Sequence, residues 1–277
     1  MPGDQALYLL VGQRLALGFR AAGRVVSVQR WERVSQNRTV GNRYLRPMDE
    51  PSRPRSVLVA GATGLVGQEI LDLLRDDRNV GRIVVISRRS MEGENSPKVE
   101  SHLVDFDNLE RHAELFAVDQ IFCALGTTIK KAGSEAAFRH VDYDFPVAIA
   151  QLGRDRGATH FLLVSAIGAS ARSRFFYNRV KGELEDVIRT LGYRTVTIVR
   201  PSLLVGKRDE FRLGEQIAMR FADVVPKKYR PVEARDVAAA LVESARDDSP
   251  GFHIIESSEI RHVAAGEQER QPRTDQP

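Results

Sequence analysis

A tyrosine and a lysine stand four residues apart at Tyr177 and Lys181, and this spacing places both side chains on one face of a helix. Of the six tyrosines in the sequence, only Tyr177 has a lysine four positions later. A free phenol has a pKa of about 10 and is a slow acid at neutral pH, but a neighbouring ammonium favours the phenolate and lowers that pKa. The pair is therefore a candidate for general acid/base catalysis, with Tyr177 moving the proton and Lys181 tuning it.

A serine, Ser165, stands twelve residues before Tyr177, at the end of a predicted strand. Its hydroxyl is a candidate to hydrogen-bond a carbonyl oxygen as negative charge develops there. Together, Ser165, Tyr177 and Lys181 supply the polar groups that carbonyl reduction needs at the oxygen atom. The alternative interpretation is a surface helix that carries an ordinary tyrosine and lysine.

Three glycines, Gly61, Gly64 and Gly67, connect the first predicted strand to the first predicted helix. Gly61 allows a tight turn, Gly64 lets the backbone approach a pyrophosphate, and Gly67 lets helix and strand pack closely. The N–H groups at the start of the helix then hold the phosphate charge. The segment predicts a dinucleotide site built from Gly61, Thr63, Gly64, Leu65, Val66 and Gly67; the alternative is the glycine-rich turn of any α/β protein.

Two arginines, Arg88 and Arg89, follow the second predicted strand, where an acidic residue would bond the ribose 2′-hydroxyl of NAD. Guanidinium groups pair with a 2′-phosphate and stack on adenine, so we predict NADP(H) as the cofactor. After the third strand, Asp105 and Phe106 are candidates to contact the adenine. Alternatively, the arginines are solvated and Phe106 belongs to the core.

Short apolar runs alternate with helical patterns from residue 55 onward. Strands are predicted at 56–60, 82–87, 99–104, 120–125, 160–165, 194–200 and 252–255. Helices are predicted at 65–74, 109–116, 134–156 with a kink or restart at Pro146, 173–191, 213–222 and 233–245. This alternation predicts an α/β fold: a Rossmann-type, doubly wound parallel sheet, with a small C-terminal substrate lobe from about Leu203 to Glu256.

The charge of the chain is uneven, because residues 1–54 hold nine arginines and four acidic residues whereas residues 55–262 have no net charge. A neutral body gives no reason to expect nucleic-acid binding. No apolar run of about 18 residues is present, so no membrane span is predicted. The single cysteine, Cys123, and six scattered histidines argue against a disulfide framework and a histidine-rich metal site.

The composition divides the chain into three predicted parts. These are a disordered or dispensable extension at 1–54, an NAD(P)-binding domain with its small lobe at 55–256, and a disordered tail at 257–277. An arginine-rich, acid-poor leader is also typical of an organelle transit peptide, and a start site upstream of the native one would look the same.

Taken together, these motifs resemble the short-chain dehydrogenase/reductase superfamily, and most closely its atypical NADPH-binding group, which includes the Tat-interacting-protein oxidoreductases and their bacterial relatives. The resemblance covers about residues 56–255. It rests on the segments 61–67, 87–89, 104–106, 122–128, 131–133, 177–183 and 199–201. It implies that Leu125, Gly126 and Thr127 lie near the nicotinamide, and that Pro201, Ser202 and Leu203 do so as well. Ser202 replaces the glycine that usually follows this proline.

We therefore expect an NADPH-dependent oxidoreductase that reduces a small carbonyl substrate, as a cytoplasmic monomer or homodimer. Its cofactor would be held by the glycine turn, Arg88 and Arg89, together with Tyr177 and Lys181. Two alternatives remain open from the sequence: a nucleotide-sugar epimerase or dehydratase, and an NADPH-sensing regulatory protein.

Overall fold

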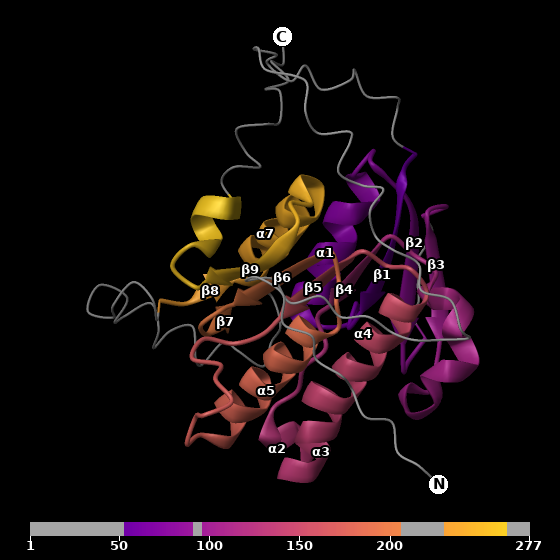
Figure 1. The fold of residues 1–277 in the computed structure, drawn as a ribbon. Helices are drawn as coiled ribbons and strands as arrows, with labels where there is room; N and C mark the ends of the chain where they lie inside the picture. The colour runs from indigo at the N-terminus through magenta and orange to yellow at the C-terminus, as the bar shows by residue number, and fades with distance from the viewer. Residues whose placement is uncertain (1–52, 91–95, 206–229, 265–277) are drawn as a thin grey trace, which may run out of the picture. The chain divides into compact units, whose positions relative to one another are not determined.

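The computed structural model describes residues 53–90, 96–205 and 230–264, which all belong to one compact unit, Ser52–Pro277 (Figure 1). Residues 1–52, the predicted helix at 213–222 and most of the predicted tail, 265–277, lie outside the described residues. The domain boundaries therefore stay predictions. The described chain continues past residue 256, and Ile260 is fully buried.

Seven parallel strands form the central sheet in the order β3-β2-β1-β4-β5-β6-β9. They are β1 Arg55–Ala60, β2 Val80–Ser87, β3 Val99–Leu103, β4 Gln120–Cys123, β5 His160–Val164, β6 Thr195–Arg200 and β9 Gly251–Glu256. A separate two-stranded sheet pairs β7 Leu204–Val205 with β8 Val232–Glu233. The order of the large sheet reverses between β1 and β4, which is where doubly wound sheets bind their ligands.

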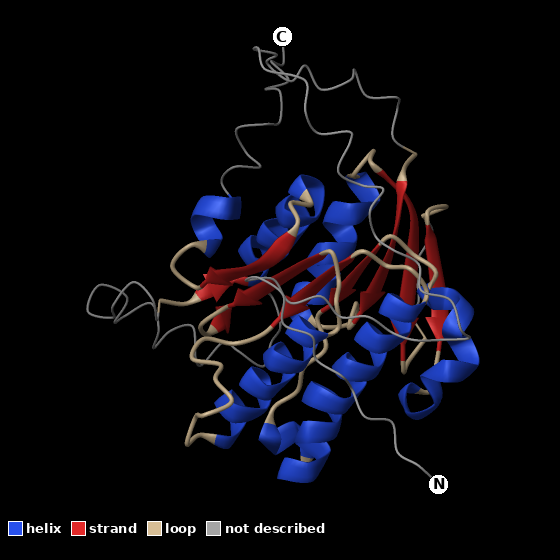
Figure 2. Cartoon of the chain, viewed as in Figure 1, coloured by secondary structure: helices blue, strands red, loops and turns tan. Residues whose placement is uncertain are grey.

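The helices lie between successive strands and cover both faces of the sheet (Figure 2). The helical segments are α1 Leu65–Asp76, the 3₁₀ segment η1 Phe106–Phe116, α2 Ile129–Ala132, α3 Glu135–Arg139, the π-helical turn η2 His140–Asp144, α4 Phe145–Asp155, α5 Phe176–Thr190 and α7 Ala234–Asp247. None of the described helices combines the length and apolar character needed to cross a bilayer.

Apolar side chains bury both faces of the sheet. Val57 and Val59 of β1 pack in the core beneath α1 and α7, whereas Leu58 and Ala60 point to the opposite core beneath η1, α4 and α5. Because helices cover both faces of β1, its side chains are buried whichever way they point. This explains why the sequence of β1 is a continuous apolar run. The predicted Rossmann-type fold is confirmed.

The helical stretch predicted at 134–156 keeps right-handed helical backbone angles at the boundaries between its segments, and its irregularity is the π-helical turn η2, which precedes Pro146. Pro146 itself lies in the first turn of α4. A π-turn inside a helix often marks a functional site. The sequence analysis missed α2, although Thr128 caps its N-terminus and Gly133 ends it in the left-handed region.

Candidate active site

The turn after β1 requires glycine at two positions. Gly61 has φ of +90°, and a Cβ atom there would lie 2.6 Å from the carbonyl oxygen of Ala124. A Cβ on Gly67 would lie 2.1 Å from the carbonyl oxygen of Gly61. Both distances are far below van der Waals contact, so the turn places β1, the start of α1 and the end of β4 closer together than any side chain permits.

The N-terminus of α1 begins directly after this turn, with Gly64 as its N-cap. Gly64 has no side chain that could accept a hydrogen bond from the first-turn N–H groups, which include those of Val66 and Gly67. A Cβ on Gly64 would lie 3.1 Å from the oxygen of Gly61, a tight but less severe contact. N–H groups at a helix start that receive no side-chain cap from Gly64 suit the phosphates of a dinucleotide.

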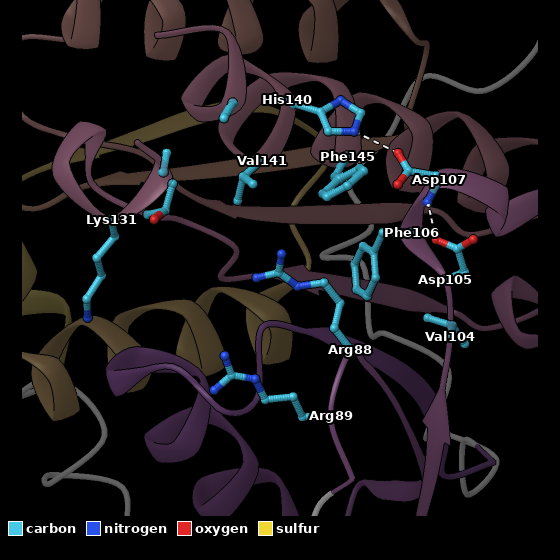
Figure 3. Close-up of a pocket in the computed structure, with 13 residues that line it drawn as sticks. Arg88, Arg89, Val104, Asp105, Phe106, Asp107, Lys131, His140, Val141 and Phe145 are labelled. Carbon is cyan, nitrogen blue, oxygen red and sulfur yellow. Dashed lines mark hydrogen bonds and ion pairs between the residues drawn. The ribbon is translucent and has the colours of Figure 1, made fainter. Parts of the chain in front are cut away.

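A cavity of about 990 Å³ opens at the carboxyl ends of β2, β3 and β4 (Figure 3). Segments far apart in the sequence meet around it. The lining residues are Arg88, Arg89, Val104, Asp105, Phe106, Asp107, Thr127, Lys131, Ala132, Ala137, His140, Val141 and Phe145. The structure thus brings Arg88, Arg89, Asp105, Phe106 and Thr127, which the sequence analysis had selected, to one cavity.

The aromatic and acidic residues of this cavity are held by local contacts. The ring of Phe106 lies 5.3 Å from that of Phe145, and both are buried. The carboxylate of Asp105 accepts hydrogen bonds from the side chain of Asn108, at 2.6 Å, and from the backbone of Asp107, at 3.0 Å. These two bonds lower the pKa of Asp105. Its carboxylate therefore caps η1 in addition to lining the cavity.

His140, which the sequence analysis did not select, lines the cavity beside Phe145 and lies between two carboxylates. Its Nε2 is 2.7 Å from Asp107 and its Nδ1 is 3.0 Å from Asp144. The hydrogen bonds to Asp144 and then Asp107 raise the pKa of His140. The imidazole also lies 4.4 Å from the ring of Phe145. It connects η1 to η2 across the end of the cavity.

Tyr177 and Lys181 lie on α5, where Lys181 is buried and Tyr177 is half-buried with its ring 5.4 Å from that of Phe138. Nζ of Lys181 is 2.8 Å from Oδ1 of Asp142, and the exposed fractions of these two side chains are only 3% and 1%. Burial alone would lower the pKa of Lys181, but the charge of Asp142, followed by that of Tyr177, outweighs burial and raises it.

Lys181 does lower the pKa of Tyr177, as expected, but the net shift of that pKa in this structure is upward. Burial raises the pKa of Tyr177, the charge of Lys181 opposes this, and the charge of Asp142 adds to the rise. The net direction is upward because the phenolate loses its hydration in the buried site and because Asp142 offsets part of the lysine charge.

Ser165 is 5% exposed, and its hydroxyl donates a hydrogen bond to Oε1 of Glu185 at 2.5 Å. Arg200 at the end of β6 donates to both oxygens of the same carboxylate, at 3.1 and 2.5 Å, and reaches Glu256 with its remaining nitrogen at 2.8 Å. Ser165 thus belongs to a network that joins β5, α5, β6 and β9.

The two segments that the resemblance assigned to the nicotinamide side have different surroundings. The N–H of Thr127 donates to Oδ2 of Asp142 at 2.8 Å, which places the segment after β4 beside the Lys181 ion pair. After β6, the N–H of Ser202 donates to the hydroxyl of Ser257 at 3.2 Å, and the Ser202 hydroxyl donates to the carbonyl of Arg230 at 2.5 Å. Leu203 is 49% exposed.

Two buried carboxylates, Asp142 and Glu185, were missed by the sequence analysis. For Glu185 the sequence carried a signal, because it continues the spacing of Tyr177 and Lys181 by four residues and so lies on the same helix face. The sequence contained no such signal for Asp142, because an acidic residue in a helical pattern is more often exposed and nothing in the sequence pairs it with Lys181.

Comparison with known proteins shows the family of the chain. Residues 61–248 match the NAD(P)H-binding family model. The chain is 32% identical to protein HTATIP2 of Rattus norvegicus over 216 residues, which cover 76% of this chain and 89% of that protein. It is 36% identical to the mitochondrial protein fmp52 of Emericella nidulans over 180 residues, 63% of this chain and 77% of the relative.

Solved structures share the fold at low identity. A UDP-N-acetylglucosamine 4-epimerase from Methanobrevibacter ruminantium, solved with UDP-N-acetylmuramic acid, superposes with a TM-score of 0.58 at 13% identity, over 74% of this chain and 77% of that one. Likeness at this identity shows the fold alone.

The relatives correct one expectation and decide the family. Several fungal relatives are named as mitochondrial proteins, which contradicts the cytoplasmic location predicted from the sequence. Amino-acid composition does not reliably identify the compartment of a protein. The family model, these relatives and the Rossmann-type sheet all agree with the predicted resemblance. The chain belongs to the NAD(P)H-binding family of the atypical short-chain dehydrogenase/reductase superfamily, an oxidoreductase-type family that includes HTATIP2 and FMP52.

Proposed function

We propose that this protein is an NADPH-dependent reductase of a small carbonyl compound. The observation that carries the proposal is the position of Arg88 and Arg89, which line the cavity at the carboxyl end of β2 (Figure 3). Guanidinium groups at this position suit the 2′-phosphate of NADPH, whereas an acidic residue would suit the free 2′-hydroxyl of NADH. Lys131 adds a third cationic side chain to the same lining.

We assign the rest of the cofactor to residues that follow one another along the sheet edge. Phe106 offers a ring face for the adenine beside Arg88. The glycine turn and the N-terminus of α1 accept the pyrophosphate, because Gly64 presents backbone only. Lys181 then donates hydrogen bonds to the nicotinamide ribose through the ammonium N–H groups that do not face Asp142.

When bound, NADPH supplies the hydride for the carbonyl carbon. Tyr177 supplies the proton for the carbonyl oxygen from its phenol. The raised pKa keeps the Tyr177 phenol protonated at neutral pH, the form that an acid needs, but also makes it a weaker acid than a free phenol. Lys181 contributes a positive charge beside the developing phenolate. The hydroxyl hydrogen of Ser165 is used by Glu185, so the proposal leaves Ser165 outside the proton path.

The proposal is tested by mixing the full chain with NADPH and a panel of aldehydes, ketones and quinones, and following the loss of NADPH absorbance. We expect turnover with at least one compound. Tyr177→Phe should lower that turnover by about 10²–10⁴-fold, the usual range for general acid catalysis, and leave NADPH affinity nearly unchanged.

Tyr193→Phe is the matched control, because Tyr193 is half-buried like Tyr177 but its hydroxyl donates to the carbonyl of Ala150 at 2.7 Å. This variant should keep its turnover. Full turnover by Tyr177→Phe would show that the proton comes from another group. A wild-type chain that binds NADH as tightly as NADPH would contradict the cofactor assignment.

A further inference from the structure

A single carboxylate, that of Asp142, joins two segments of the candidate site. Its Oδ1 lies 2.8 Å from Nζ of Lys181 on α5, and its Oδ2 accepts the N–H of Thr127 from the segment after β4 at 2.8 Å. The side chain is 1% exposed and comes from the π-helical turn η2. The amide of Thr127 therefore fixes one oxygen of the carboxylate, and the other oxygen fixes the ammonium.

The surroundings of Lys181 make this contact necessary. The ionisable groups that face the ammonium are Asp142 from η2, Tyr177 from the preceding turn of α5 and the buried thiol of Cys123 from β4. Burial raises the pKa of Cys123 to about 11, so this thiol is neutral near pH 7. Tyr177 also keeps its proton, so among the described residues Asp142 is the anion that faces an ammonium only 3% exposed. A buried ammonium without an anion would lose its proton or move.

We propose that Asp142 is a positioning residue, which holds the ammonium of Lys181 charged and in place beside Tyr177 and acts on cofactor binding and proton transfer through that lysine. The inference rests on the proposed roles of Tyr177 and Lys181. It adds a residue that contacts neither reacting atom but decides the charge of the group next to the proton donor.

Removing the charge of Asp142 should shift the first titration of the Lys181–Tyr177 pair in the same direction, whichever of the two groups loses its proton. The working state of the site is a charged Lys181 with a protonated Tyr177. Removing a nearby negative charge makes the loss of the first proton from this pair easier, whether the ammonium or the phenol gives it up. Asp142→Asn should therefore move this first titration to lower pH. The amide oxygen of Asn can still accept the N–H of Thr127, so the segment after β4 keeps its anchor.

The test measures NADPH affinity of the full chain by fluorescence titration between pH 7 and pH 10. We expect wild type to keep its affinity to the top of this range. Asp142→Asn should lose affinity within the range, because an opposite charge at this distance shifts a pKa by about 1–3 units. Asp142→Glu, which keeps the charge, should restore binding at high pH. The pH at which affinity falls is informative, since a purely structural defect weakens binding equally at every pH.

Glu185→Gln is the matched control, because Glu185 is the other buried carboxylate on this face of α5 and is paired with Arg200 rather than Lys181. It should lower the melting temperature without moving the pH dependence of NADPH binding. Equal behaviour of Asp142→Asn and Glu185→Gln, or an Asp142→Asn profile parallel to that of wild type, would overturn the proposal.

A double variant keeps the test decisive if Asp142→Asn does not fold alone. Asp142→Asn combined with Lys181→Met leaves neither charge unpaired. If Asp142 acts through Lys181, the double variant binds NADPH as Lys181→Met does at every pH; a further loss of affinity contradicts the proposal. Absence of NADPH binding by wild type would overturn the proposed function and this inference together, whereas normal binding with an unshifted profile overturns the inference alone.

Discussion

The hydroxyl of Ser165 donates to Oε1 of Glu185 at 2.5 Å, and this bond turns the serine at the end of β5 toward the network that ties α5 to β6. The distance is that of a charge-assisted hydrogen bond, which is about twice as strong as a neutral one. A hydroxyl has one hydrogen, so Ser165 cannot donate to Glu185 and to a substrate oxygen at the same time.

This relationship predicts a structural effect of Ser165→Ala rather than a catalytic one. Glu185 keeps its bonds to Arg200, so the free energy of unfolding should fall by about 1–2 kcal/mol, the range for one lost buried hydrogen bond. Turnover should fall by less than about tenfold, because a lost oxyanion donor typically costs about 10²–10³-fold. Urea unfolding measures the loss of stability, and steady-state rates measure the loss of turnover. A loss of turnover as large as that of Tyr177→Phe would show that Ser165 takes part in the reaction.

Cofactor preference should depend on the two cavity arginines. Each charge-assisted hydrogen bond to a 2′-phosphate contributes about 1.5–3 kcal/mol, so Arg88→Ala and Arg89→Ala should each weaken NADPH binding about tenfold or more and change NADH binding little. Arg82→Ala is the control, since Arg82 lies in β2, the strand that the two arginines follow, but pairs with Glu100 at 2.9 and 2.8 Å. Fluorescence titration with both nucleotides gives the answer, and equal losses for NADPH and NADH would contradict it.

Two glycines of the turn should respond differently to alanine. Gly67→Ala places a Cβ 2.1 Å from the oxygen of Gly61, so the variant should lose several kcal/mol of stability or fail to fold. Gly64→Ala meets the same oxygen at 3.1 Å, a contact that a small backbone shift relieves. We expect it to fold but to bind NADPH weakly, because the methyl group occupies the approach of the pyrophosphate. Thermal melts and NADPH titrations of both variants separate folding from binding.

Stability should fall in mild acid because of His160. This side chain is fully buried, its Nδ1 lies 2.9 Å from Asp248 and its Nε2 lies 3.0 Å from the hydroxyl of Thr197. Burial lowers the pKa of His160 to about 4 from an ordinary 6.5, with Asp248 opposing the shift. The unfolded chain therefore binds a proton that the folded chain resists, and stability is lost as the pH falls from about 6.5 to about 4.

The size of this loss is on the order of 3 kcal/mol, from about 1.4 kcal/mol per pKa unit. Urea unfolding at several pH values should show a smaller acid loss in His160→Gln than in wild type. His140 provides an opposite control: its pKa is raised, so its contribution is present below pH 6.5 and disappears as the pH rises through the higher folded pKa. An equal acid loss in wild type and His160→Gln would contradict the assignment.

The amino-acid sequence by itself determined where the seven strands of the large sheet lie along the chain, because a parallel strand buried on both faces must be apolar throughout, as Val57 to Ala60 are. It also determined the glycine turn, since the backbone around Gly61 and Gly67 excludes any Cβ. Arg88 and Arg89 were found because their place at the end of a strand follows from chain order alone. These features depend on residues close in sequence.

Only the tertiary structure decided which groups the polar residues of the site contact. Ser165 bonds Glu185 twenty positions later, and Lys181 pairs with Asp142 from a different helical segment; neither partner is specified by spacing. The direction of the Tyr177 pKa was also decided there, because it is the balance of burial against two charges from separate elements. Desolvation and Coulomb energies depend on distances through space, and the chain sets those distances only when β4, η2 and α5 have packed together.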